Sequence, residues 1–174
     1  NSGYDRGHMA PAWLMFNLYG ATAHTQSFLM SNITPQTHRF NAGAWQRLEE
    51  LEADIIPRWF KDVYSISGVV FEREPPRLRR GIAVGHAFYK LFVGIDKRGV
   101  PHALTVRLPH NAAPNAPLDQ YTITIDALEK ETGLDFNAHL DDNAEAALES
   151  ALPSNAWATF YLHSRKPGRY TKDL

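Results

Sequence analysis

The sequence predicts an α+β fold with a mainly antiparallel sheet and flanking helices, from two observations. Several apolar, β-branched segments read as short strands, and the helical segments are mixed with them without the β-α-β rhythm of a parallel sheet. The expected strands are residues 27–33, 63–71, 86–96, 101–109 and 121–126, and the expected helices are residues 41–56, 126–132 and 141–152.

Local signals justify these elements in order. The segments 86–96 and 101–109 are joined through "KRG", which indicates a hairpin. The charged, proline-containing segment 72–81 is predicted to be a loop. Asp126 is the expected cap of the short helix that follows, with Glu129 three positions on as its capping-box partner. These signals predict an antiparallel arrangement.

The segment 41–56 has the clearest helical period. Its apolar side chains share one face and most of its charged side chains share the other. The apolar face consists of Trp45, Leu48, Leu51, Ile55 and Ile56, and the polar face of Arg47, Glu50 and Asp54. Glu52 falls on the wrong side of this pattern. Pro57 is expected to end or kink the helix.

Composition bounds the class of protein. The chain has 174 residues, of which 44% are hydrophobic and 21% charged, as in one globular domain covering residues 1–174. The net charge of −1 provides no overall basic field, so an anionic ligand must be held by a local arrangement of charge. The absence of cysteine excludes disulfides, thiolate nucleophiles and cysteine-ligated metal. No apolar run approaches the roughly 20 residues of a membrane span.

Three motifs in the first third of the chain carry candidate chemistry. "DRGH" places Arg6 and His8 two positions apart, and "SNITPQ" supplies Asn32. "NAGAWQRLEE" begins the amphipathic helix with Asn41 and Glu49. At roughly 100° per residue these last two lie about 80° apart on the helix and about two turns along it. An amide oxygen and a carboxylate can therefore face one cleft.

Together, and in this order, the three motifs resemble the DNA/RNA non-specific endonucleases with a ββα-metal (His-Me) finger. Downstream, "HAFYKLFVGID" and "YTITIDALEKETGLDF" resemble later strands and a capped helix of that family, so the resemblance covers most of the chain. It implies a ββα-metal finger at about residues 4–60, packed on the central sheet. It also implies metal-dependent hydrolysis of phosphodiester bonds in DNA and RNA, leaving 5′-phosphate ends.

The resemblance also implies a role for each motif residue. His8 would be the general base, and Asn41 the direct protein ligand of Mg²⁺, with Mn²⁺ as a substitute. Glu49 would bind the metal through water, Arg6 would contact a phosphate, and Asn32 would orient the site. A neutral imidazole suits proton abstraction near neutral pH, and an amide oxygen suits a hard cation that keeps most of its waters.

Two departures from the family pattern are visible. Ala53 stands where family members usually have an arginine, so one phosphate contact is missing or supplied elsewhere. Family members also have strands before "DRGH". We therefore expect a preceding N-terminal segment, present as a separate polypeptide fragment of the same protein. The other expected partners are DNA and RNA substrates and a second copy in a homodimer, with no membrane. By family analogy alone, a secreted or periplasmic location is favoured.

Each motif residue also has a plainer interpretation. His8 alone would be a surface or structural histidine, and Asn41 a helix N-cap. Glu49 would pair with a basic side chain on the helix, and Arg6 with Asp5 or with an acidic residue of a helix. Gly7 is expected to let the backbone pass close to the substrate.

Two further segments and the overall function keep alternatives open. The apolar segment 13–20 is expected to pack in the core, and the alternative is that Trp13, Phe16 or Tyr19 stack on bases. The arginines of loop 72–80 are either solvated or form a phosphate-tracking patch. The functional alternatives are a ββα-metal phosphodiesterase with a narrower substrate and a catalytically weak nucleic-acid-binding module.

Overall fold

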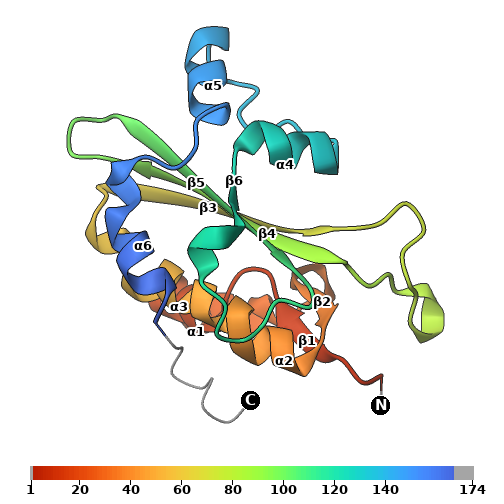
Figure 1. Ribbon diagram of the computed structural model, residues 1–174. Coiled ribbons are helices and arrows are strands. Elements are labelled where there is room, and N and C mark those ends of the chain that lie inside the picture. The colour runs from red at the N-terminus through yellow and green to blue at the C-terminus, as the bar shows by residue number, and fades with distance from the viewer. Residues whose placement is uncertain (1, 167–174) are drawn as a thin grey trace.

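A computed structural model describes residues 2–166 and has two antiparallel sheets (Figure 1). A small sheet pairs β1 (Asp5–His8) with β2 (Ile33–Gln36). The larger sheet has the order β3-β4-β5-β6 and only antiparallel neighbours. Its strands are β3 (Asp62–Val70), β4 (Ala87–Ile95), β5 (Pro101–Pro109) and β6 (Thr122–Ile123). The predicted α+β class is confirmed.

Helices cover both faces of the larger sheet (Figure 1). The α-helices are α1 (Ala12–Ser27), α2 (His38–Phe40), α3 (Gln46–Asp54), α4 (Ile125–Thr132), α5 (Asp142–Glu149) and α6 (Ala158–Ser164). A π turn, η2 (Asn41–Trp45), joins α2 to α3. The shorter turns are η1 (Met30–Asn32), η3 (Ile56–Arg58), η4 (Arg79–Gly81), η5 (Leu118–Tyr121) and η6 (Asn155–Trp157). α2, α3 and α6 lie on one face of the sheet, and α4 and α5 on the other.

β4 is buried on both faces because it lies in the interior of the sheet. On one side Phe88 and Phe92 join the main core with Trp45 of the π turn. On the other side Tyr89 and Leu91 pack in smaller clusters beneath α4 and α5. This double burial explains why the strand reads as an almost continuous apolar run in sequence.

The predicted helix 41–56 is confirmed, but its start is earlier. Helical structure begins at His38, with Thr37 at the N-cap position, and passes through the π turn into α3. Gly43 lies where a Cβ would come within 2.8 Å of Pro114, so a larger residue would clash there. The plainer interpretation of Asn41 as an N-cap is therefore wrong, because Asn41 lies inside the helical segment.

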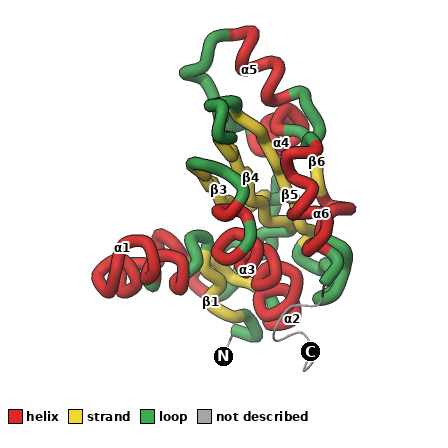
Figure 2. Tube along the Cα trace, turned by 90° about the vertical axis from the view of Figure 1, so that its left-hand side faces the viewer, coloured by secondary structure: helices red, strands yellow, loops and turns green. Residues whose placement is uncertain are grey.

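Two sequence predictions around β2 and α1 are wrong. The strand expected at 27–33 begins only at Ile33, and most of that segment instead ends α1 and forms η1. The segment 13–20 is not core: it belongs to α1, which projects from the body of the molecule (Figure 2). Trp13 is 64% exposed and Tyr19 70%. The apolar content of this segment therefore did not predict its burial correctly.

The cap of α4 also differs from the prediction. Thr124, rather than Asp126, is the N-cap, and its hydroxyl accepts from the amide of Ala127 at 3.1 Å. The carboxylate of Glu129 accepts from the amide of Phe136 at 2.8 Å instead of closing a capping box. The predicted strand 121–126 shortens to β6 because helical structure starts at Ile125.

β3 forms an outer edge of the larger sheet. Its partner on one side is β4, and the other side has no strand among residues 2–166. Tyr64 and Ile66 on this strand are exposed. Within the same residues, no helix is both long enough and apolar enough to cross a membrane.

Candidate active site

His8 stands at the end of β1, where the chain turns sharply into α1. Asn32 holds this turn: its amide oxygen accepts from the backbone of Ala10, and its amide nitrogen donates to the carbonyls of Ala10 and Ser27, each at 2.9 Å. The amide of Met9 donates to the carbonyl of Asn32 at 3.0 Å. Asn32 therefore fixes the backbone immediately after His8.

Gly7 serves the packing between the two strands of the small sheet. A Cβ at this position would overlap the side-chain oxygen of Gln36, which is fully buried. The space above Gly7 is therefore filled by a side chain of the same sheet. The expectation that Gly7 leaves room for the substrate is wrong.

The helical segment is attached directly to β1. The indole nitrogen of Trp45 donates to the carbonyl of His8 at 3.1 Å. The amide nitrogen of Asn41 donates to Oδ2 of Asp5 at 3.1 Å, and Nδ1 of His38 lies 2.8 Å from the same oxygen. Because the side-chain nitrogen of Asn41 faces Asp5, the side-chain oxygen of Asn41 faces away from Asp5. Asp5 is engaged by these groups and forms no ion pair with Arg6 among the described residues.

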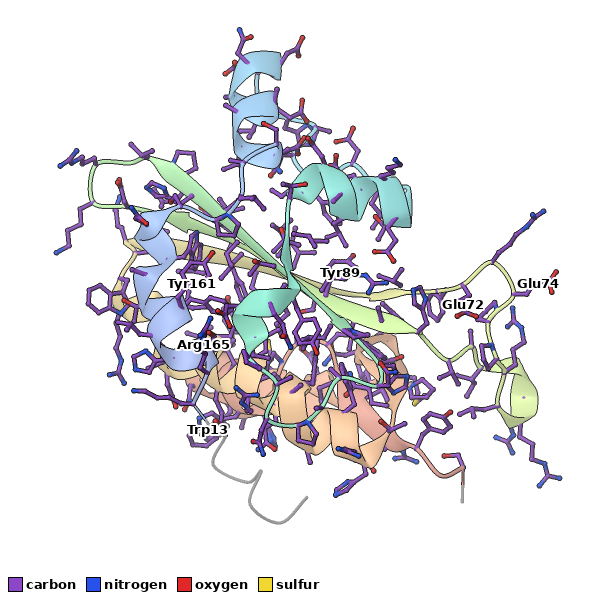
Figure 3. The ribbon with its side chains drawn as sticks, viewed as in Figure 1. Trp13, Glu72, Glu74, Tyr89, Tyr161 and Arg165 are labelled. Carbon is purple, nitrogen blue, oxygen red and sulfur yellow. The ribbon has the colours of Figure 1, made fainter. Side chains whose placement is uncertain are left out.

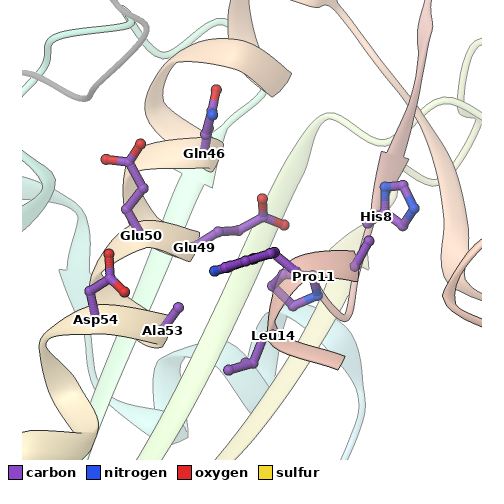
Figure 4. A pocket seen from close by; sticks show the side chains of 10 residues that line it. His8, Pro11, Leu14, Gln46, Glu49, Glu50, Ala53 and Asp54 are labelled. Carbon is purple, nitrogen blue, oxygen red and sulfur yellow. The ribbon is translucent and has the colours of Figure 1, made fainter. Parts of the chain in front are cut away.

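One pocket brings His8 and Glu49 together (Figure 4). It has a volume of about 530 Å³, with His8, Pro11 and Leu14 on one side and α3 on the other. Glu49 points from α3 across the gap toward the segment that follows β1. Ala53, which replaces the arginine of the family pattern, lines the same side one turn further along. Asn41 does not line this pocket, but lies at the start of the same helical segment.

The environment of His8 favours a neutral imidazole. Burial lowers the pKa of His8 below its ordinary value, and the nearby His24 lowers this pKa further. The ring of Phe28 packs edge-on against the imidazole at 4.7 Å between centroids. Nε2 of His8 is shielded and contacts no hydrogen-bond partner within residues 2–166. A neutral, unpaired imidazole is the form that accepts a proton.

The pKa of Glu49 is shifted upward, in the opposite direction to that of His8. Burial raises the pKa of Glu49 to about 8, with the charge of Lys90 acting in the other direction and Glu52 adding to the rise. Its Oε1 is buried and contacts no hydrogen-bond partner in the described part of the chain. The alternative that Glu49 pairs with a basic residue of its helix is not seen there. A cation nearby would supply the positive charge that stabilises this carboxylate.

These residues fit a divalent metal. A hard cation takes oxygen ligands, and the amide oxygen of Asn41 and the buried, unpartnered Oε1 of Glu49 are oxygens of that kind. A second acidic group, Asp126, Glu129 and Glu149, lies across the sheet at α4 and α5. There, Glu129 and Glu149 already accept hydrogen bonds from Phe136 and Asn137.

A buried ion pair beneath the site was missed by the sequence patterns. Nζ of Lys90 lies 2.7 Å from the carboxylate of Glu52, and both side chains are almost fully buried. Lys90 also donates to the carbonyl of Met9 at 3.2 Å and to the hydroxyl of Ser67 at 2.9 Å. The available signals were two charges out of pattern, Glu52 on the apolar face of its helix and Lys90 in an apolar strand.

Arg6 lies on the same face of β1 as His8 but does not line the His8 pocket. It lines a neighbouring groove with Tyr4, Asp5 and Arg79. The structure thus brings His8 and Glu49 into one pocket, ties Asn41 to β1, places Asn32 behind the turn, and directs Arg6 to the adjoining groove.

Known proteins resemble this chain over most of its length. It is 33% identical over 150 residues to a protein named Nuclease from Serratia marcescens, covering 84% of this chain and 55% of that protein. It is 31% identical over 164 residues to the mitochondrial nuclease EXOG of Homo sapiens, covering 83% and 42% of the two chains. The crystal structure of the EndoG/EndoGI complex matches the fold with a TM-score of 0.71 and 25% identity, covering 81% of this chain and 62% of that one.

The chain spans about half the length of the curated relatives it matches. The model of the family described as DNA/RNA non-specific endonuclease matches residues 1–143, which include β1, β2 and the helical segment that carries Asn41 and Glu49. The small sheet and this helical segment form the ββα unit predicted from the motifs, and the chain belongs to the DNA/RNA non-specific endonuclease family.

Proposed function

We propose that this chain is a metal-dependent endonuclease domain that hydrolyses phosphodiester bonds of DNA and RNA and leaves 5′-phosphate ends. One observation carries the proposal: Nε2 of His8 and Oε1 of Glu49 are buried without a hydrogen-bond partner among the described residues, and both side chains line the same pocket. Unpaired buried polar groups are costly in a folded protein, so two of them in one pocket indicate a ligand that pairs with them.

In this proposal His8 removes a proton from the attacking water. Burial keeps its imidazole neutral near pH 7, and Asn32 holds the turn that fixes its backbone. Arg6, two residues before His8 on the same face of β1, binds a phosphate of the substrate. β1 carries both side chains, and its antiparallel pairing with β2 fixes their register.

Asn41 would hold the metal, and Glu49 would bind it through water. We propose Mg²⁺ as the resident ion, with Mn²⁺ as a substitute, because a few neutral and anionic oxygen donors suit a small hard cation that keeps most of its waters. When bound, the ion supplies stabilisation of the negative charge that develops on the phosphate and on the departing oxygen. Asp5 and Trp45 orient the helical segment that presents both residues.

The relatives support an endonuclease function, since the two described above are named as nucleases. The alternative of a catalytically weak nucleic-acid-binding module is disfavoured, because binding alone requires neither an unpaired imidazole nitrogen nor a buried, unpaired carboxyl oxygen. A phosphodiesterase with a narrower substrate would use the same residues and differs only in what it cuts.

Digestion of a plasmid and of an RNA, with and without EDTA, tests the proposal. We expect both substrates to be cut, EDTA to stop cleavage, and added Mg²⁺ to restore it. Asn41→Ala should require more Mg²⁺ for half-maximal rate, whereas Asn111→Ala, in the loop after β5, should not. Failure of the parent protein to cut either nucleic acid would overturn the proposal. Cleavage of DNA alone or of RNA alone would favour the narrower phosphodiesterase.

The open edge of the sheet motivates a proposal on partners. A groove of about 550 Å³ lies beside β3 and is lined by residues of α1 and of β3. We propose that a separate N-terminal piece of the same protein adds a strand to this edge. Intact mass spectrometry of an active sample should then reveal two polypeptides, and a single polypeptide with full activity would contradict this. A homodimer, the other partner we propose, would double the mass measured by light scattering.

A further inference from the structure

The groove beside Arg6 is built from two segments that are distant in sequence. Its volume is about 640 Å³, and the small sheet and η1 form one wall while the loop between β3 and β4 forms the other. Ile33, the register partner of His8, lines this groove, so the groove begins next to the catalytic strand. Arg6 faces it from β1 and Arg79 from the loop.

The loop between β3 and β4 is an ordered turn. It projects from the right-hand end of the sheet in Figure 1 and carries η4. The amide of Leu78 donates to the carbonyl of Ile82 at 2.8 Å, and the amide of Gly81 donates to Leu78 at 3.0 Å. The guanidinium of Arg77 is used inside the turn, donating to the carbonyl of Gly81 at 2.7 Å. Arg79 and Arg80 are thereby left at the exposed tip.

The backbone at this tip is unusual. Arg80 has φ 72°, in the left-handed region that residues other than glycine rarely adopt. Such a conformation persists only where the surrounding structure holds it, and it is found preferentially at ligand-binding segments. The turn thus places two neighbouring arginines at a fixed position rather than on a flexible tether.

The charges of this groove are uncompensated. Within residues 2–166 no acidic partner contacts the guanidinium of Arg6, Arg79 or Arg80. Among the described residues that line the groove, Asp5 is the one carboxylate, and it is already engaged by His38 and Asn41. Glu72 and Glu74 belong to the earlier half of the loop (Figure 3) and do not line the groove.

The pocket on the other side of His8 has the opposite charge. Glu50 and Asp54 line it beside Glu49, whose raised pKa reduces its own charge, and no lysine or arginine among residues 2–166 lines it. A polyanion that reaches His8 is therefore attracted on the side of Arg6 and repelled on the side of α3. The proposed metal position is the exception on the α3 side, because a bound cation would attract the polyanion there. Because the whole chain has a net charge of −1, this local difference sets the direction of approach.

We propose that Arg6 and Arg79 form a phosphate-binding track for the nucleic-acid strand that flanks the scissile bond, with the loop between β3 and β4 as its outer wall. The inference rests on the proposed function and extends it to the substrate beyond the cleaved phosphate. The apolar groove residues Met30, Ile33 and Ile82 suit the sugar and base faces between phosphates. Contacts of this kind hold the backbone and do not read sequence.

Binding is measured first, without cleavage. In the His8→Ala background, the affinity for a fluorescent single-stranded oligonucleotide is measured by anisotropy over a range of salt concentrations. Arg79→Ala should weaken binding about threefold to fivefold and reduce the slope of log affinity against log salt by about 0.7, the value for one lost phosphate contact on a single strand. Arg79→Lys should largely restore the slope, because the charge is kept.

Arg98→Ala is the matched control. Arg98 is an exposed arginine in the turn between β4 and β5, at the opposite end of β4 from the arginine loop. It should change neither affinity nor slope. Equal behaviour of Arg79→Ala and Arg98→Ala would overturn the proposal.

Cleavage then separates this inference from the proposed function. In the protein that retains His8, Arg79→Ala should raise KM for the oligonucleotide. It should not change the hydrolysis of bis(p-nitrophenyl) phosphate, because this substrate is too short to reach Arg79. An equal loss on both substrates would point to a structural role and overturn the track. If the parent cuts neither substrate, the proposed function fails, and the anisotropy result still decides the phosphate track on its own.

Discussion

The side chains that face the His8 pocket and those directly beneath it follow opposite rules. His8 and Glu49 each present a buried polar atom with no hydrogen-bond partner among the described residues. One layer below, Lys90 and Glu52 pair with each other and with Met9, Ser65 and Ser67. The comparison indicates that the two unpaired atoms at this site are held in place by a frame built on the buried Lys90–Glu52 ion pair.

The largest change is expected when the paired layer is broken. Lys90→Met leaves the carboxylate of Glu52 buried without its cation, and should lower the free energy of unfolding by about 3–5 kcal/mol. The double variant Lys90→Met/Glu52→Leu removes both charges and should recover most of this loss. Urea denaturation of the three proteins measures it. A single variant as stable as the double variant would show that the pair does not support the frame.

The unpaired layer should respond in the reverse way. Glu49→Gln keeps the shape of the side chain and removes a carboxyl group whose ionised form burial disfavours, so the free energy of unfolding should stay the same or rise. The cleavage rate should fall about tenfold to hundredfold, the cost of losing a group that orients metal-bound water. Denaturation and steady-state kinetics are compared on the same sample. If Glu49→Gln lost stability and kept its activity, Glu49 would have a structural role like that of Lys90 and Glu52.

A smaller effect concerns the pKa of His8. The neutral imidazole is the active form, so the cleavage rate at saturating metal should fall as the pH drops through a midpoint below the ordinary histidine value of 6.5. The charge of His24 opposes protonation of His8, so His24→Gln should raise the pKa of His8 and move this midpoint upward. A pH–rate profile of both proteins tests the shift. An unchanged midpoint in His24→Gln would show that His24 does not influence the pKa of His8.

The same contrast explains what the sequence could predict. The helix with Trp45, Leu48 and Leu51 on one face and the β4–β5 hairpin follow from local periodicity and turn residues, and both are present. The three motifs that form the site are also local strings, so they could be located before the structure. Their spatial relations, such as the placement of Arg6 in a groove apart from His8, depend on strand register and could not.

The failures of prediction have tertiary causes. The apolar segment 13–20 looked like core, yet it lies in α1, where little of the rest of the described chain covers it. Glu52 looked like a misfit because its partner, Lys90, is 38 positions away in sequence and meets it only when β4 packs under α3. No pattern within a single element contains such a pairing.

One kinetic comparison tests whether His8 is the general base. The rate of DNA cleavage at saturating Mg²⁺ is measured for the parent, for His8→Ala and for His139→Ala, which alters an exposed histidine with no part in the site. We predict a fall of about a hundredfold or more for His8→Ala, with folding intact by circular dichroism, and no change for His139→Ala. A His8→Ala protein that cuts DNA at the parental rate would contradict the account.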